Sequence, residues 1–124
     1  MFYACYRLSL LGWNAMPTSR NAKGIDVICF SMDGTKMKTV QVKSMSTRSP
    51  VPLGPTLGKI MGDYWVIVNN AINARRQSFV LESDEVRKLA HRGEKGGRVS
   101  YWLQPRAYDV VAFRERWDRI GEGC

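Results

Sequence analysis

Two β-prone runs separated by the dipeptide Asp33-Gly34 constrain the fold of this chain more than any other feature of the sequence. The first run spans residues 25–32 and the second spans residues 36–44. Asp-Gly is favoured in the two-residue turns that join antiparallel strands, because the backbone twist of such turns matches that of the strands. The sequence therefore predicts a β-hairpin over residues 25–44.

The register of this hairpin follows from its turn. If the Asp-Gly dipeptide is the loop, counting back along both strands places Asp26 opposite Gln41, and a four-residue loop gives the same pairing. A three-residue loop with a bulge would instead set Asp26 opposite Val42. Because side chains alternate along a strand, the predicted register puts six residues on one face: Asp26, Ile28, Phe30, Thr39, Gln41 and Lys43. The opposite, core face carries Val27, Cys29, Val40 and Val42.

The remaining segments predict further strands and three helices. We expect a helix over 2–11, strands over 13–18, 63–71, 78–81 and 99–103, a helix from Ser83 to near Gly93, and a C-terminal helix carrying Val110, Phe113, Trp117 and Ile120. Prolines and glycines crowd the stretch from Ser46 to Gly58, which predicts an irregular surface loop. The order of elements predicts a mixed α/β (α+β) fold with a single mixed sheet and flanking helices.

A length of 124 residues suits one hydrophobic core, so we expect a single domain over residues 1–124. The hydrophobic share of 44% and the charged share of 24% are typical of globular proteins and exclude disordered and low-complexity classes. The longest apolar run, Tyr64 to Val68, is too short for a membrane helix, and the first residues do not resemble a signal peptide. We therefore expect a cytoplasmic protein without a membrane anchor.

Basic residues are concentrated in the first half of the chain. The net charge is +8, and residues 1–62 hold eight basic residues against two acidic ones, an excess of +6. A polyanion such as nucleic acid is therefore expected to meet the first half of the chain. The alternative is that the surplus charge serves only to keep the domain soluble.

The predicted hairpin brings a carboxylate, a carboxamide and an ammonium together at its open end: Asp26, Gln41 and Lys43. A carboxylate and a carbonyl oxygen can hold Mg²⁺, which polarises a phosphate and lowers the pKa of bound water, while a lysine neutralises developing charge. This combination suits phosphodiester hydrolysis. Structural interpretations stand beside it, with Asp26 as a strand-end aspartate held by backbone N–H groups and Lys43 as a charge that protects an edge strand.

Gly24-Ile25-Asp26, the hairpin and Gln41-Val42-Lys43 resemble the core motif of the PD-(D/E)xK nuclease superfamily, which has the restriction-endonuclease-like fold. The segment Leu10-Leu11-Gly12-Trp13, which closes the predicted first helix, and the later Tyr64–Val68 strand look like a bacterial branch of small members. The resemblance implies a restriction-endonuclease-like core and metal-dependent cleavage of DNA.

The resemblance also implies a role for each motif residue. Asp26 is expected to bind the metal, Gln41 to occupy the acidic second position, Lys43 to be the catalytic lysine, and the carbonyl of Val42 to be a further metal ligand. Glutamine lacks the charge of the acid usual at its position, so we expect Mg²⁺ or Mn²⁺ to bind weakly. The glutamate that many members carry near the start of the first helix falls at or before Met1, so the domain is expected to lack the start of that helix or its acid.

The leading interpretation is a Mg²⁺-dependent DNA nuclease. Arg20, Lys23 and Arg48, on loops that flank the proposed site, are the candidate contacts to DNA phosphates. Two other classes stay open: a non-catalytic nucleic-acid-binding module that retains the nuclease fold, and a dimeric structural or regulatory protein. A domain this small that cuts both strands of a duplex is expected to act as a symmetric homodimer.

Overall fold

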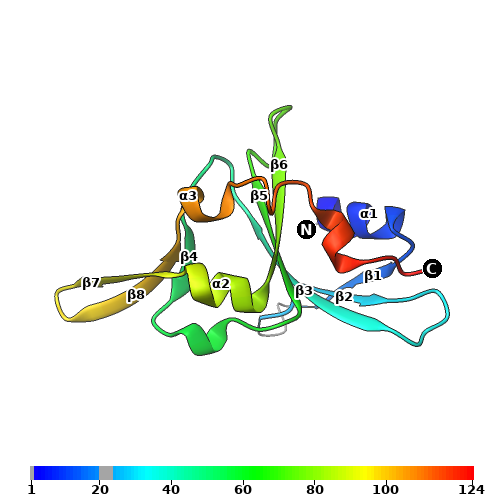
Figure 1. Cartoon of the computed structure of the whole chain (residues 1–124), viewed down its shortest axis with the longest axis horizontal. Helices are drawn as coiled ribbons and strands as arrows, with labels where there is room; N and C mark the ends of the chain where they lie inside the picture. Colours follow the sequence, from blue (N-terminus) through cyan, green and yellow to red (C-terminus); the bar gives the residue numbers. More distant parts are fainter. Residues whose placement is uncertain (1, 20–23) are drawn as a thin grey trace.

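The computed structural model describes residues 2–19 and 24–124, and its eight strands form two sheets with helices on their faces (Figure 1). The five-stranded sheet contains, in spatial order, β1 (Asn14–Pro17), β2 (Val27–Phe30), β3 (Met37–Ser44), β5 (Tyr64–Asn69) and β6 (Gln77–Glu82). Its neighbours are antiparallel except β3 and β5, which run parallel. The antiparallel three-stranded sheet contains β4 (Val51–Gly54), β8 (Arg98–Leu103) and β7 (His91–Lys95). The mixed α+β class is confirmed, with two sheets in place of the single sheet that we predicted.

Short helices complete the architecture. They are α1 (Phe2–Leu10), α2 (Ser83–Leu89) and α3 (Pro105–Tyr108), with 3-10 turns η1 (Leu57–Lys59) and η2 (Trp117–Ile120). The leading helix is confirmed, and Gly12 follows its end with φ +90°, where a Cβ atom would lie 2.6 Å from Cys124 Sγ. None of the helices in the described ranges has the length and apolar character needed to cross a membrane.

The five-stranded sheet is covered on both faces by separate apolar clusters, as alternation along β5 shows. Val66 and Val68 belong to a cluster that α1 and η2 cover, whereas Trp65 and Ile67 belong to a cluster with residues of β4, β8, α2 and α3. Strands buried on both faces read as continuous apolar runs, which explains the run in β5. The second sheet therefore packs on the Trp65 face of the first.

The hairpin forms with the predicted register. β2 and β3 are antiparallel and Val27 lies opposite Val40, so the next position of the same register is Asp26 with Gln41. Residues 31–36 connect the two strands, which makes the connection longer than the two-residue loop. The pairing is nevertheless the one expected, because lengthening a loop by equal numbers on both sides leaves the register unchanged.

The prediction of an irregular loop from Ser46 to Gly58 is wrong in its middle. β4 lies there and pairs with β8, with Val51 opposite Leu103 and a register shift between Pro52 and Gly54. β4 is an edge strand, so the missing N–H of its proline interrupts no inner ladder.

The predicted C-terminal helix is also wrong. The structure has only α3 and η2 there, and between them the chain runs beside β6, where the Val80 N–H donates to the Phe113 carbonyl at 2.9 Å. Phe113 packs in the Trp65 cluster, whereas Trp117 and Ile120 pack in the α1 cluster. The segment thus passes around the edge of the sheet from one face to the other, as its orange-to-red course in Figure 1 shows. Apolar residues that pack on opposite faces of the sheet cannot lie on the single apolar face of one helix.

The second helix ends earlier than predicted. α2 stops at Leu89, and β7 begins at His91, inside the range predicted for the helix. β7 pairs with β8 in a hairpin whose turn residues Gly96 and Gly97 have φ of 59° and 78°. Gly-Gly between two strands is a signal for a two-residue turn, and it marks the strand that we did not predict.

Candidate active site

The motif residues lie where β2 and β3 separate. The β2–β3 ladder stops at the pair Val27–Val40, while β3 continues to Ser44 beside β5 alone. Asp26, one residue before β2, is buried at this point with 8% exposure. The end of the ladder leaves backbone groups of β3 available to other partners.

Asp26 is fixed against β3 through its backbone and its side chain. Its N–H donates to the Val40 carbonyl at 3.0 Å, and its carbonyl accepts from the Thr18 N–H at 2.8 Å. Its carboxylate Oδ2 accepts the Val42 N–H at 2.8 Å. The carboxylate thus takes the place of a strand partner at the position where β2 has left the ladder. Oδ1 receives no hydrogen bond from the described residues.

Gln41 presents a buried carboxamide whose oxygen has no partner. The residue is 8% exposed, and its Oε1 receives no hydrogen bond within the described ranges 2–19 and 24–124. An unpaired buried acceptor costs about 1–3 kcal/mol, so this oxygen has an unmet demand for a donor or a cation. Gln41 is in parallel register with Trp65, which puts it on the face that the second sheet covers.

Lys43 shares this face, two residues along β3. It is in register with Ile67, and its Nζ lies 5.7 Å from the centroid of the Trp65 ring, a cation–π contact. No carboxylate in the described part of the chain forms a salt bridge with it. The ammonium therefore keeps its charge available to an anion.

The donors present are hard oxygen ligands of the kind that Mg²⁺ prefers. Asp26 supplies a carboxylate and Gln41 an unpartnered carbonyl oxygen, and Mg²⁺ commonly uses one or two protein ligands together with waters and substrate phosphates. The described residues contain no group of three or more His, Cys, Asp or Glu that could hold a metal ion. The donor set fits a weakly held Mg²⁺ better than a permanent metal centre.

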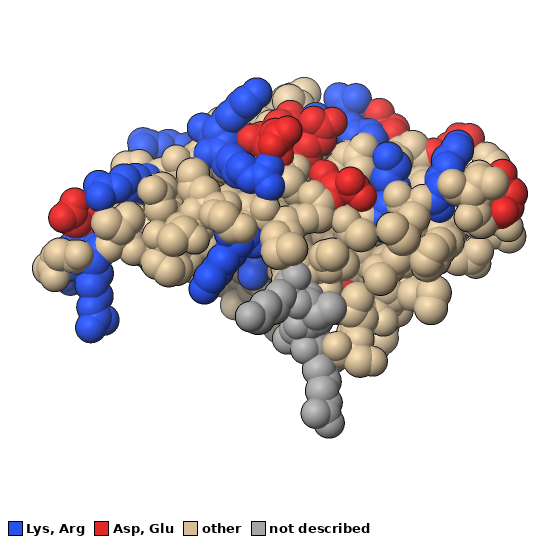
Figure 2. Space-filling view, turned by 90° about the horizontal axis from the view of Figure 1, so that it is seen from below, with Lys and Arg blue, Asp and Glu red and all other residues tan. Residues whose placement is uncertain are grey.

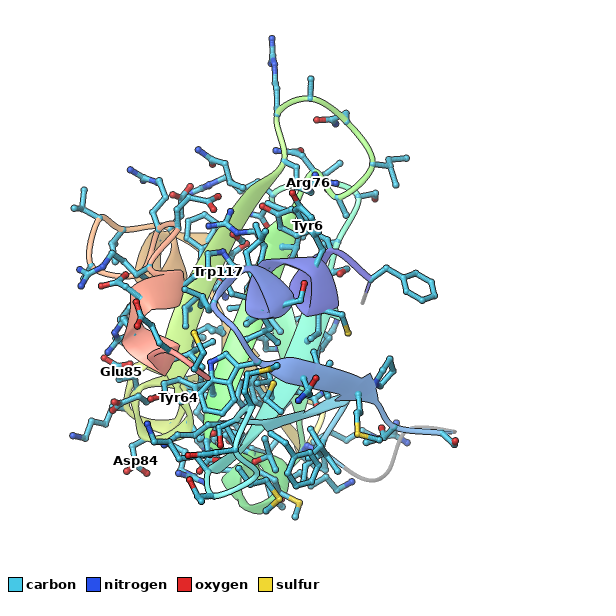
Figure 3. The ribbon with its side chains drawn as sticks, turned by 90° about the vertical axis from the view of Figure 1, so that its right-hand side faces the viewer. Tyr6, Tyr64, Arg76, Asp84, Glu85 and Trp117 are labelled. Atoms are coloured by element: carbon cyan, nitrogen blue, oxygen red, sulfur yellow. The ribbon has the colours of Figure 1, made fainter. Side chains whose placement is uncertain are left out.

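Asp63, the acid that precedes β5, is engaged elsewhere. Its Oδ2 accepts the Thr39 N–H at 2.8 Å and the Thr39 hydroxyl at 3.2 Å. It lines a cavity of about 390 Å³ with Tyr64, Asp84 and other residues of β5, β6 and α2. Figure 3 shows the labelled Tyr64 and Asp84 on one side of the molecule. Lys38 and Arg87 line the same cavity, and none of the three motif side chains does.

A second cavity lies beside Gly24, two residues before Asp26 in the sequence. Gly24, Gly58, Lys59 and Met61 line a hollow of about 380 Å³, so the η1 segment lies next to Gly24. Lys59 has no salt bridge within the described ranges. Lys59 is therefore a candidate phosphate contact that the sequence analysis did not single out, although a basic residue inside a glycine-rich stretch was an available signal.

Of the predicted phosphate contacts, only Arg48 can be placed, because Arg20 and Lys23 lie outside the described residues. The Arg48 Nε donates to Asp109 Oδ2 at 2.8 Å, and Arg114 donates to the other oxygen of the same carboxylate at 2.8 Å. The hydrogen bond from Arg114, followed by that from Arg48, holds the pKa of Asp109 below its ordinary value. A phosphate at Arg48 would have to compete with this carboxylate.

The fold and the motif place the chain in a class of mixed α+β domains with a nuclease-like core. Among solved structures it is similar to Hjc, a Holliday junction resolvase from the hyperthermophilic archaeon Archaeoglobus fulgidus, with a TM-score of 0.58 and 13% sequence identity over 88% of this chain and 91% of that chain. No protein-family model matches the chain, and no curated protein matches its sequence. At this identity the likeness shows a shared fold, and it confirms the nuclease-like core that the motif implied.

Proposed function

We propose that this chain is a Mg²⁺-dependent DNA nuclease of the PD-(D/E)xK type. The observation that carries the proposal is the buried Oε1 of Gln41, which has no hydrogen-bond partner among the described residues and lies on the strand whose next residue, Val42, donates its N–H to the Asp26 carboxylate. Lys43 follows two residues later without an acidic partner among the described residues. A carboxylate and a carbonyl oxygen can hold a divalent cation, and an ammonium can offset the charge that develops on the phosphate, so these three groups suit metal-assisted phosphodiester cleavage.

Each motif residue has a distinct task in this reaction. Asp26 and Gln41, with the carbonyl of Val42 as a further candidate, would hold the cation, which supplies polarisation of the phosphate and a lower pKa for bound water. The Val42 N–H orients Asp26 by occupying Oδ2, which leaves Oδ1 for the ligand. Lys43 binds a non-bridging phosphate oxygen and offsets the negative charge that develops during attack.

Branched DNA is the substrate that we propose to test first, because the structural neighbour is a Holliday junction resolvase by name. The net charge of +8 favours a polyanion of this kind. Cleavage on two strands of such a substrate calls for two sites, so we propose that the chain acts as a homodimer.

Incubation of a four-way DNA junction and of plasmid DNA with Mg²⁺ or Mn²⁺ tests the proposal. The wild type should cut, whereas Asp26→Asn and Lys43→Met should not. Asparagine can still accept the Val42 hydrogen bond, so the first variant should fold. Asp118→Asn and Lys88→Met make the same chemical changes at exposed positions in the second half of the chain, outside the motif, and should cut normally. Equal cleavage by the motif variants and their controls would refute the assignment.

The second candidate is a DNA-binding module without catalysis. It is favoured because the described residues contain no cluster of three or more His, Cys, Asp or Glu that could hold a metal ion, and the motif itself supplies a single carboxylate. Salt-dependent DNA binding without cleavage in Mn²⁺ would support this candidate over the nuclease. Absence of both binding and cleavage would leave the structural or regulatory class.

A further inference from the structure

The β7–β8 hairpin extends beyond the sheet to which it belongs. β4 pairs with β8 only from Tyr101 to Leu103, whereas β7 pairs with β8 as far as Lys95 opposite Arg98. Three residue pairs therefore extend past the last contact with β4, a length of about 10 Å at roughly 3.3 Å per residue. Figure 1 shows this hairpin projecting from the left end of the molecule.

The tip of the hairpin is narrow. Gly96 and Gly97 form its turn, both with positive φ, and a Cβ atom added to either would meet nothing within 4 Å. The backbone of the tip can therefore approach another surface closely, with the side chains of Lys95 and Arg98 on either side of it.

The charges on the tip are unfavourable for the isolated protein. Lys95 and Arg98 are exposed and directly opposite one another, and like charges in that position destabilise a strand pair. The nearby acid, Glu94, forms its salt bridge with Arg92 at 3.3 Å. Neither tip residue has a salt bridge to the described part of the chain. An anion bound between the two would remove the repulsion.

The position and width of the hairpin fit a double-stranded polyanion. A two-stranded β-ribbon fits the major groove of duplex DNA, where phosphates border both sides. Figure 2 shows basic side chains projecting at the β7–β8 end, with an acidic group among them, and basic and acidic side chains interspersed over the rest of this face. The sheet that carries the hairpin packs on the same face as Gln41 and Lys43.

We propose that the β7–β8 hairpin is a DNA-binding arm that lies in a groove of the duplex, with Lys95 and Arg98 on the phosphates. This inference rests on the proposed DNA substrate but not on catalysis. Because the arm lies in the second half of the chain, it lies outside the basic first half to which sequence reasoning assigned the polyanion.

Binding to a duplex of roughly 30 base pairs, about three helical turns, tests the arm when it is measured from about 50 to 200 mM salt. The double variant Lys95→Ala/Arg98→Ala should lower the slope of log K against log salt by about 2, roughly 0.9 per phosphate contact, and weaken binding roughly tenfold or more. The control Arg75→Ala/Lys88→Ala removes the same charge from exposed positions of the second half of the chain, outside the arm, and should leave the slope nearly unchanged.

An equal change of the salt slope in the arm variant and in its control, or no change in either, would refute the DNA-binding role of the hairpin. An unchanged thermal unfolding midpoint shows that Lys95→Ala/Arg98→Ala is folded. If this variant is unfolded, Lys95→Gln/Arg98→Gln is used in its place. If the wild type cleaves DNA but Lys95→Ala/Arg98→Ala has the wild-type salt slope, the DNA-binding role of the hairpin is refuted and the nuclease proposal stands. If the double variant has a lowered slope but the wild type does not cleave DNA, the DNA-binding role stands and the nuclease proposal is refuted.

Discussion

Replacing Gln41 by glutamate tests whether the Oε1 atom of this residue is part of a metal site. The substitution Gln41→Glu keeps the length of the side chain but places a second carboxylate opposite Asp26, in a position that is 8% exposed. Without a cation the two negative charges repel, so the folded state should lose stability at neutral pH. With a divalent cation between them the repulsion disappears, and metal binding should tighten.

The strand geometry sets the size of this effect. Opposed side chains on neighbouring strands lie about 5 Å apart at Cβ, and two unit charges about 6 Å apart repel by roughly 3 kcal/mol at an effective dielectric of about 20. The Lys43 ammonium offsets part of this energy, which leaves about 2 kcal/mol. The metal-free variant should be destabilised by about 2 kcal/mol, and Mn²⁺ should bind it about 30-fold more tightly than wild type.

Calorimetric titration with Mn²⁺, together with urea unfolding in its presence and absence, measures both quantities. Gln77→Glu makes the same chemical change at an exposed position of β6 and should alter neither. If the missing charge limits activity, Gln41→Glu should also raise Mn²⁺-dependent cleavage. Equal Mn²⁺ affinities for wild type and Gln41→Glu would show that Gln41 does not face a metal, and the nuclease proposal would lose its chemical basis.

Two further predictions concern an arginine and an acid outside the motif. Arg48→Ala should weaken DNA binding about equally across sequences and lower the salt slope by roughly one, and an unchanged slope would show that Arg48 stays with Asp109. Hydrogen bonds from Ser31, followed by those from Thr35, lower the pKa of Asp33 to about 2 from the ordinary 3.8. Its stabilising contribution should therefore be complete above pH 3.8 and disappear as the pH falls through about 2, and an NMR titration of Asp33 in Ser31→Ala should give a higher midpoint.

The sequence alone determined the hairpin and its register. The Asp33-Gly34 turn and the alternation of β2 and β3 specify which residues oppose each other, because a slip of one position would turn every apolar side chain to the wrong face. The same local rules predicted that the first helix ends before Gly12 and that the apolar run of β5 is a strand. Asp26, Gln41 and Lys43 were found in this way, since their placement depends on local pairing.

Only the tertiary structure decided the second sheet and the course of the C-terminal segment. β4 forms in a proline-rich stretch because it pairs with the edge of β8. The C-terminal residues with helical spacing run alongside β6 because they are buried in two apolar clusters on opposite faces of the sheet. The unmet hydrogen-bond demand of Gln41 is likewise a property of its packed surroundings. Local propensity acts through neighbours in the sequence, whereas these features arise from contacts between residues far apart in it, whose burial outweighs that propensity.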